Sequence, residues 1–144
     1  MVCRWQTLQL ADKTLILDAT HNPEGAEMLR ENLEALVQKD QRKPVIIAGT
    51  TGELRARSLM SVVGNYAREL HLVTPKQPNA TPSHTLETHL PDEHTVPVFH
   101  AEVETLFPTP ETCSIGESGD TIVVTGSIYL VGEVLKQLTE NVSP

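Results

Sequence analysis

Short apolar segments alternate with helix-length amphipathic segments along this chain of 144 residues, and this alternation restricts the possible folds more than any other feature. A short continuous apolar run followed by glycine is typical of a strand buried on both faces, and residues 44–48 before Gly49 show that pattern. Residues 121–125 before Gly126 show it again. Strands separated by helices are joined by right-handed crossovers, which align the strands in parallel in one sheet.

The apolar periodicities and the turn residues between them predict the remaining elements. Further strands are expected at residues 5–10, 14–17, 70–74 and 96–99. Helices are expected at residues 23–38, 53–69, 83–89, 102–107 and 128–139, and a loop at 108–119. The tight turn at Ala11-Asp12-Lys13 makes the first two strands antiparallel. We therefore predict an α/β fold, Rossmann-like in outline, with a mostly parallel sheet, an antiparallel N-terminal strand and helices on both faces.

The composition indicates one domain with an aliphatic core. Only 3% of the residues are aromatic, against 39% hydrophobic overall, so Leu, Val, Ile and Ala must form the core. A chain of this length can bury one such core, and we treat residues 1–144 as a single domain. The formal net charge of −8 argues against a nucleic-acid partner, because a phosphate-binding surface needs clustered Lys and Arg.

Cysteine usage and hydropathy indicate the cellular compartment. Cys3 and Cys113 are the only cysteines, which fits a reducing cytosol better than a disulfide framework. Neither His nor Asp is close to Cys113 in the sequence, so we do not expect a nucleophile there. No signal pattern begins the chain, and no apolar run approaches the length of about 18 residues that indicates a transmembrane helix. We expect a cytoplasmic protein with no membrane partner.

Three histidines in the polar stretch after residue 75 are spaced by five residues: His84, His89 and His94. Side chains at that spacing do not line one helix face, and Pro91 interrupts the segment. We therefore predict no metal site in this chain.

Polar residues follow the second strand directly, in the segment Asp18-Ala19-Thr20-His21-Asn22-Pro23. Asn22 is a good N-cap for the helix that follows, and Pro23 suits its first position. Ligands of open α/β sheets bind beyond the carboxyl ends of the strands, and a helix N-terminus favours anions. The segment thus presents a carboxylate and an imidazole where an anionic ligand would bind.

A second junction of this kind is Thr125-Gly126-Ser127. The glycine lets the backbone approach a ligand closely, and the serine can cap the next helix or donate to a phosphate or carboxylate. Helix capping alone, with Asp18 accepting local amides, is the plainer interpretation of both junctions, and the pattern leaves it open beside an anion site. Because the strands are parallel, we predict that Asp18, His21 and Ser127 lie on one edge of the sheet.

Three segments, in this order, resemble the folylpolyglutamate synthases, a family of the Mur ligase superfamily of ATP-dependent amide ligases. They are Arg4-Trp5-Gln6, residues 15–23 and residues 124–134. They are similar to the family's Pro-Gly-Arg motif followed by an aromatic residue, its Asp-x-Ala-His-Asn-Pro motif and its Gly-Ser-x-Tyr-x-Val-Gly-Glu motif. Together the three segments span nearly the whole chain.

The resemblance implies the C-terminal domain of a dihydrofolate synthase/folylpolyglutamate synthase. Such an enzyme uses ATP and Mg²⁺ to add L-glutamate to dihydropteroate or a folate through an acyl phosphate, and is typically monomeric. In the family an N-terminal ATPase domain supplies the phosphate-binding loop, the magnesium ligands and a carbamoylated lysine. This sequence has no G-x-x-x-x-G-K-S/T loop, so we expect the domain to be inactive by itself and to need an upstream ATPase domain as its partner.

The resemblance also implies roles for four residues. Arg4 is expected to contact ATP, and Asp18 to hold the nucleotide at its ribose. His21 is expected at the phosphoryl-transfer and glutamate site, and Ser127 at the glutamate.

Several positions depart from the family pattern. Val2-Cys3 stands where the family has Pro-Gly, and Thr20 replaces the usual Ala. Leu54-Arg55-Ala56 occupies roughly the place of an acidic-Lys-acidic stretch, and residues 75–119 match weakly.

Two alternatives stay open at this stage. One is the C-terminal domain of another Mur-type amide ligase, such as a peptidoglycan ligase or cyanophycin synthetase, although residues 126–133 favour the folate branch. The other is a stand-alone nucleotide- or anion-binding module, which the absence of a phosphate-binding loop would fit.

Overall fold

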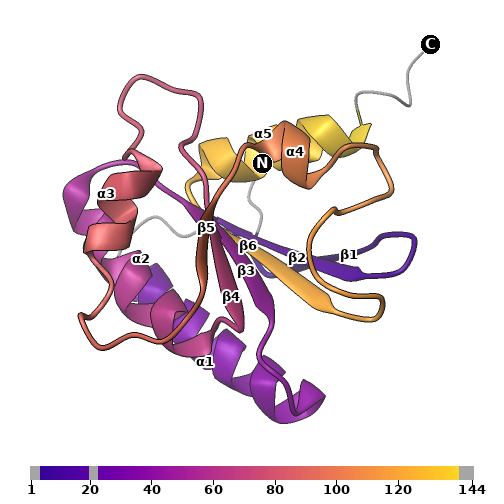
Figure 1. The fold of residues 1–144 in the computed structure, drawn as a ribbon, viewed down its shortest axis with the longest axis horizontal. Coiled ribbons are helices and arrows are strands. Elements are labelled where there is room, and N and C mark those ends of the chain that lie inside the picture. Colours follow the sequence, from indigo (N-terminus) through magenta and orange to yellow (C-terminus); the bar gives the residue numbers. More distant parts are fainter. Residues whose placement is uncertain (1–3, 20–22, 140–144) are drawn as a thin grey trace.

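The computed structural model describes residues 4–19 and 23–139, which form a six-stranded sheet with helices on both faces (Figure 1). The strands are β1 (Gln6–Gln9), β2 (Thr14–Ala19), β3 (Val45–Gly49), β4 (Glu69–Leu72), β5 (Val98–His100) and β6 (Thr121–Gly126). The helices are α1 (Pro23–Asp40), α2 (Glu53–Tyr66), α3 (Ser83–Thr88), α4 (Val103–Leu106) and α5 (Ile128–Thr139).

The sheet has the strand order β1-β2-β6-β3-β4-β5. Strand β1 pairs antiparallel with β2, and the other four pairs are parallel. This confirms the predicted α/β, Rossmann-like fold with its antiparallel N-terminal strand.

Several predicted boundaries differ from the structure by one to three residues, and two of these differences have clear local reasons. The helix predicted at residues 53–69 ends at Tyr66, because Ala67 is extended and the amide of Arg68 donates to the carbonyl of Pro44. The strand predicted at residues 96–99 begins only at Val98. Pro97 has no N–H for a strand ladder, and its carbonyl accepts the amide of Leu70 instead.

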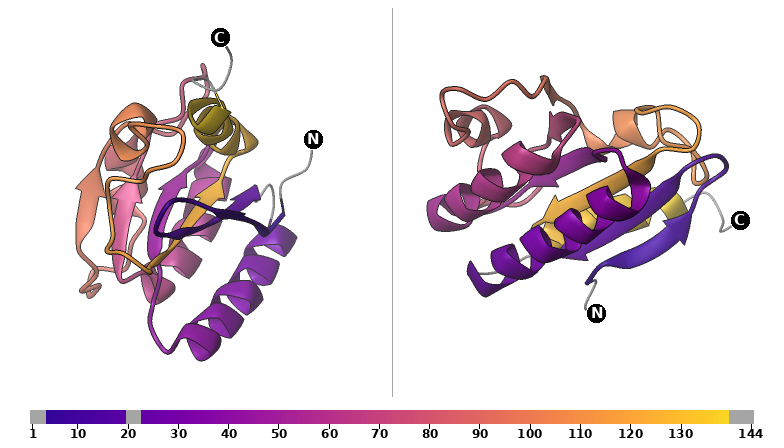
Figure 2. Two further views of the ribbon diagram at one scale, coloured as in Figure 1. Left: turned by 90° about the vertical axis from the view of Figure 1, so that its right-hand side faces the viewer. Right: turned by 90° about the horizontal axis from the view of Figure 1, so that it is seen from below.

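Helices α1, α2 and α3 cover one face of the sheet, and α4 and α5 cover the other (Figures 1 and 2). Successive strand residues point to opposite faces, so Ile46 packs under α1 and α2 while Ile47 packs under α5. This explains why the central strands are apolar without alternation. Leu29 and Leu33 of α1 are fully buried, and burial of a leucine contributes about 1.5–3 kcal/mol.

None of the helices among the described residues combines the length and the apolar composition needed to cross a membrane.

Asp120, which is only 4% exposed, connects the loop before β6 to other segments at the amino-terminal edge of the sheet. Its Oδ2 accepts from the amide of Glu117 at 2.6 Å and from Nη2 of Arg68 at 2.5 Å. Nη1 of Arg42 lies 3.4 Å from Oδ1. Burial alone would raise the pKa of Asp120, but this amide and the two guanidinium groups outweigh burial and hold its pKa below the usual value.

We expect Asp120→Asn to lower the free energy of unfolding at pH 7 by about 1.5–3 kcal/mol, because Arg68 loses a charged hydrogen-bond partner. The folded-state pKa of Asp120 is depressed, so its contribution is present above the unfolded-state pKa of about 3.9 and is lost as pH falls through the folded-state value. Urea unfolding at a series of pH values checks this. The difference from wild type should narrow in acid, whereas a constant difference, or an equal loss for the exposed Asp92→Asn, would contradict the assignment.

Candidate functional site

Two of the predicted site residues lie at the carboxyl ends of neighbouring strands. Strands β2 and β6 pair in parallel, with Asp18 beside Thr125 and Ala19 beside Gly126. Ser127 follows Gly126 directly, so Asp18 and Ser127 lie on one edge of the sheet, as predicted. His21 falls outside the described residues.

Asp18 also brings the segment of Arg4 to this edge. The backbone amide of Trp5 donates to Oδ1 of Asp18 at 3.1 Å, and Gln6 pairs with Leu17 in the β1–β2 ladder. Trp5 has a φ of 52°, in the left-handed region that side chains rarely adopt, so this hydrogen bond stabilises an unusual turn. Asp18 is only 7% exposed, and its carboxylate therefore orients the chain next to Arg4 whatever else it binds.

Ser127 caps helix α5. Its Oγ accepts from the amide of Tyr129 at 3.0 Å, and its own amide donates to the carbonyl of Gly49 at 2.8 Å. This is N-cap geometry, in which the hydroxyl satisfies one of the unpaired amides of the first helical turn. A serine hydroxyl that accepts one hydrogen bond still has a proton to donate, so capping is compatible with a contact to an anionic ligand.

Gly126 permits a close contact between two strand ends. Its φ is 129°, and a Cβ built there would lie 2.0 Å from the carbonyl oxygen of Gly49. The backbone of β3 therefore fills the space beside Gly126. The sequence pattern predicts the close approach of a ligand at this glycine, whereas the contact that the structure shows is with Gly49.

The junction between β3 and α2 is a third polar segment on the same edge, which is absent from the sites predicted from the sequence. Thr50 and Thr51 are buried, and Nη1 of Arg55 lies 3.3 Å from Oγ1 of Thr51. Gly49 is adjacent to Gly126 in the β3–β6 ladder. Both junctions have the same pattern, in which a buried strand is followed by a glycine, a small hydroxyl residue and then a helix. This shared pattern was the signal in the sequence that could have identified the third polar segment.

Large apolar side chains are exposed beside these polar residues. Leu54, in the first turn of α2, is 72% exposed, and Ile128 and Tyr129, in the first turn of α5, are 36% and 55% exposed. Both helices begin at the edge that holds Asp18 and Ser127. Exposed apolar groups around polar ones are typical of a surface that contacts another domain or a ligand.

Cys113 has the properties expected of a structural residue. It is 4% exposed, and burial raises the pKa of its thiol, so the nucleophilic thiolate is disfavoured at neutral pH. Cys3 falls outside the described residues.

Comparison with known proteins identifies relatives of the chain. The profile of the family described as "Mur ligase, glutamate ligase domain" matches residues 3–128. Comparison with curated protein sequences yielded no match.

Three similar solved structures share the fold. A bifunctional folylpolyglutamate synthase/dihydrofolate synthase from Yersinia pestis, complexed with AMPPNP and Mn, has a TM-score of 0.74 at 22% identity over 96% of this chain and 31% of its own. FolC from E. coli in complex with DHPP and ADP has a TM-score of 0.76 and 18% sequence identity, over 99% of this chain and 32% of the FolC chain. A bifunctional folylpolyglutamate synthase/dihydrofolate synthase with Mn, AMPPNP and L-glutamate bound has a TM-score of 0.70 and 22% sequence identity, over 96% of this chain and 32% of its own. The chain thus spans about a third of the length of these structures.

We expect Ser127→Ala to lower the free energy of unfolding by about 0.5–2 kcal/mol, because the first turn of α5 loses its side-chain cap. Urea denaturation of the 144-residue chain measures this change. Ser118→Ala, in an exposed loop, is the matched control and should stay within about 0.5 kcal/mol of wild type. Wild-type stability in Ser127→Ala would mean that the cap contributes nothing.

Proposed function

The chain belongs to the Mur ligase glutamate ligase domain family, and from this premise we propose that it is the C-terminal domain of an ATP-dependent ligase that adds L-glutamate to dihydropteroate or a folate. The observation that carries the proposal is that parts of all three family-like motifs meet at one sheet edge. The amide of Trp5, next to Arg4, donates to Asp18, and Ser127 follows the strand that pairs with the strand of Asp18. Similar folds in solved structures bind nucleotide, glutamate and DHPP, which supports the same substrate classes here.

The proposed reaction activates a carboxylate before the amide forms. The γ-phosphoryl group passes from ATP to the substrate carboxylate, giving ADP and an acyl phosphate. The glutamate amine then attacks the carbonyl carbon, the bond to the phosphate oxygen breaks, and phosphate and a proton leave. Charge develops on the transferring phosphoryl group, where cations and fixed hydrogen-bond donors stabilise it.

Each motif residue has a role in this proposal that its chemistry allows. The carboxylate of Asp18 accepts hydrogen bonds, so it is assigned to the ribose hydroxyls, and the guanidinium of Arg4 is assigned to ATP. His21 is assigned to the phosphoryl-transfer and glutamate site. The Ser127 hydroxyl, already oriented by its cap, is assigned to the glutamate.

Mg²⁺ fits this edge poorly as a site of its own. The two junction motifs bring one carboxylate to it, that of Asp18, and its Oδ1 already accepts the amide of Trp5. Mg²⁺ prefers carboxylates together with substrate phosphates in a near-octahedral arrangement. We therefore place the magnesium ligands in a second domain, where the ion would neutralise charge on the phosphates.

That second domain is an ATPase domain carrying the phosphate-binding loop, which this sequence lacks. The exposed Leu54, Ile128 and Tyr129 beside the polar edge support such a partner. The chain spans only about a third of the length of the similar structures, which also supports a second domain. The proposed assembly is a cytoplasmic monomer containing both domains.

A stand-alone nucleotide- or anion-binding module is the second candidate function, favoured by the missing phosphate-binding loop alone. Tight ATP binding by the 144-residue chain without a partner domain would distinguish it from the ligase domain.

We predict that the 144-residue chain by itself neither hydrolyses ATP at a useful rate nor ligates glutamate. A nucleotide contacted from one side keeps much of its hydration and gains few fixed contacts, so ATP binding should also be weak. Phosphate-release assays with and without glutamate, and calorimetry with ATP, measure these quantities. Glutamate-dependent phosphate release by the chain would contradict the proposal that a second domain supplies the phosphate-binding loop and the magnesium ligands.

In an enzyme that joins this domain to its ATPase domain, we predict that His21→Ala lowers kcat strongly with little change in melting temperature. The loss of one preorganised donor to developing charge costs about 2.7–4 kcal/mol, or roughly a hundred- to a thousandfold in rate. If His21 serves glutamate binding instead, the KM for glutamate should rise. His89→Ala, at the C-terminal end of α3, is the matched control.

Asp18→Asn provides the contrast, because an amide oxygen can still accept from Trp5 while the charge is lost. Its effect should fall mainly on the KM for ATP.

Unchanged kinetics in His21→Ala, or activity that falls only in step with stability, would remove His21 from the site.

A further inference from the structure

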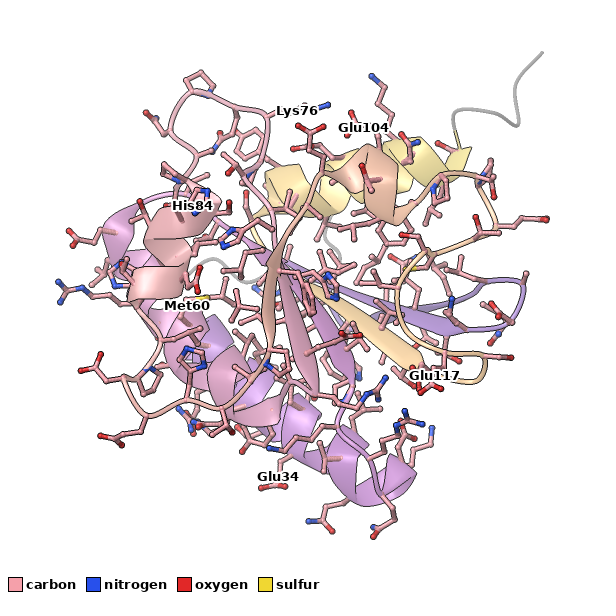
Figure 3. The ribbon with its side chains drawn as sticks, in the orientation of Figure 1. Glu34, Met60, Lys76, His84, Glu104 and Glu117 are labelled. Atoms are coloured by element: carbon pink, nitrogen blue, oxygen red, sulfur yellow. The ribbon has the colours of Figure 1, made fainter. Side chains whose placement is uncertain are left out.

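His84, Glu87 and His100 form a cluster of metal-type ligands on the carboxyl edge of the sheet, at the opposite end of that edge from Asp18. His84 and Glu87 are three residues apart on α3, so they lie on one helix face, and His100 ends β5. One ligand atom from each of the three lies within 4.8 Å of the others. Figure 3 labels His84 on α3, on the side of the molecule where β5 ends.

The imidazole of His100 is held on both of its nitrogens. Its Nε2 lies 2.7 Å from Oε1 of Glu87, and its Nδ1 lies 2.9 Å from Oγ of Ser83. Ser83 is itself buried, and its amide donates to Oγ1 of Thr74. A metal-binding histidine characteristically uses one ring nitrogen for the ion and the other for a hydrogen bond that orients the ring. Ser83 provides that orienting partner, which leaves Nε2 facing the carboxylate.

From this arrangement we propose that His84, Glu87 and His100 bind a divalent transition-metal ion of the Zn²⁺ class. Two imidazoles and one carboxylate form a ligand set that zinc accepts in proteins, with a fourth position left for water. Nitrogen ligands favour such ions over Mg²⁺ and Ca²⁺, which prefer oxygen. On binding, the ion takes the place of the proton on Nε2 of His100, and the ring carries its proton on Nδ1 instead, from which it donates to Oγ of Ser83.

The site can close around an ion with small movements. In a tetrahedral site with metal–ligand bonds of about 2.0–2.2 Å, the donor atoms lie roughly 3.3–3.6 Å apart. Nε2 of His100 and Oε1 of Glu87, now 2.7 Å apart, therefore have to separate slightly, and the donor atom of His84 has to reach the same spacing. The His84 ring stacks on that of His100, with centroids 4.3 Å apart and an interplanar angle of 24°. His84 is exposed, so its side chain can tilt out of this stack without opening the core. Ser83 and His100 also line a hollow of about 320 Å³, through which water can reach the fourth position.

This site is distant from the residues proposed for the nucleotide, although both are on the carboxyl edge of the sheet. Strand β5 is at the far end of the sheet from β1 and β2, with β6, β3 and β4 between. A bound ion would connect α3 to β5 and so restrict the motion of the segment between them. The proposal therefore does not depend on the proposed ligase function, and either can fail without the other.

The test is a titration of the 144-residue chain, stripped of metal and carrying no histidine tag, with Zn²⁺ in a calorimeter. One ion per chain is expected to bind, and His84→Ala, Glu87→Gln and His100→Ala should each raise the Kd by about tenfold or more. His94→Ala removes a histidine from the segment between α3 and β5 outside the cluster, and should leave the Kd unchanged. Zn²⁺ should also raise the melting temperature of wild type and His94→Ala more than that of His84→Ala.

Titration with Co²⁺ gives a second measurement, since tetrahedral coordination by nitrogen and oxygen ligands produces visible absorption that the three ligand variants should lose. If His100→Ala fails to fold, the exposed His84→Ala and the charge-removing Glu87→Gln decide the outcome. Absence of Zn²⁺ binding, or binding that these variants do not weaken, would overturn the proposal and leave His100 and Glu87 as a hydrogen-bonded pair.

Discussion

Strand β6 lies between β2 and β3, and the hydrogen bonds on its two sides hold both halves of the sheet together. Val124 of β6 packs into the core under α5, while Val123 packs into the core under α1 and α2. A shift of this strand by one residue would exchange the two faces and disrupt both cores at once. The register is therefore strongly specified, and with it the contact of Gly126 with Gly49 at the carboxyl end.

The side chains at that end have local structural partners as well as proposed ligands. Asp18 accepts the amide of Trp5, and Ser127 accepts the amide of Tyr129. The two interpretations that the sequence left open, helix capping and ligand binding, are thus compatible. A carboxylate and a hydroxyl oriented before a ligand arrives lose less conformational freedom on binding, which favours affinity. A change at either position affects stability together with any contact to a ligand, so kinetic and stability measurements have to be made side by side.

The histidines show where prediction from the sequence failed to find a candidate site. The spacing of His84, His89 and His94 argued against a metal site, and that argument holds for those three residues within one helix. The cluster forms instead from His84, Glu87 and His100, because β5 returns beside β4 and brings its carboxyl end to α3. Periodicity describes neighbours along one element, and contacts between elements distant in sequence depend on the packing of the sheet.

The sequence by itself determined the order of strands and helices, the antiparallel start of the sheet and the polar junctions after β2 and β6. These features follow from local apolar periodicity and turn chemistry, which act over a few residues. Only the tertiary structure decided that β6 pairs between β2 and β3, which brings Asp18 beside Thr125 and Gly126 beside Gly49. It also decided that α3 meets His100. Strand order and contacts between elements arise from burying two apolar faces of one sheet at once, a condition that no single segment of the sequence contains.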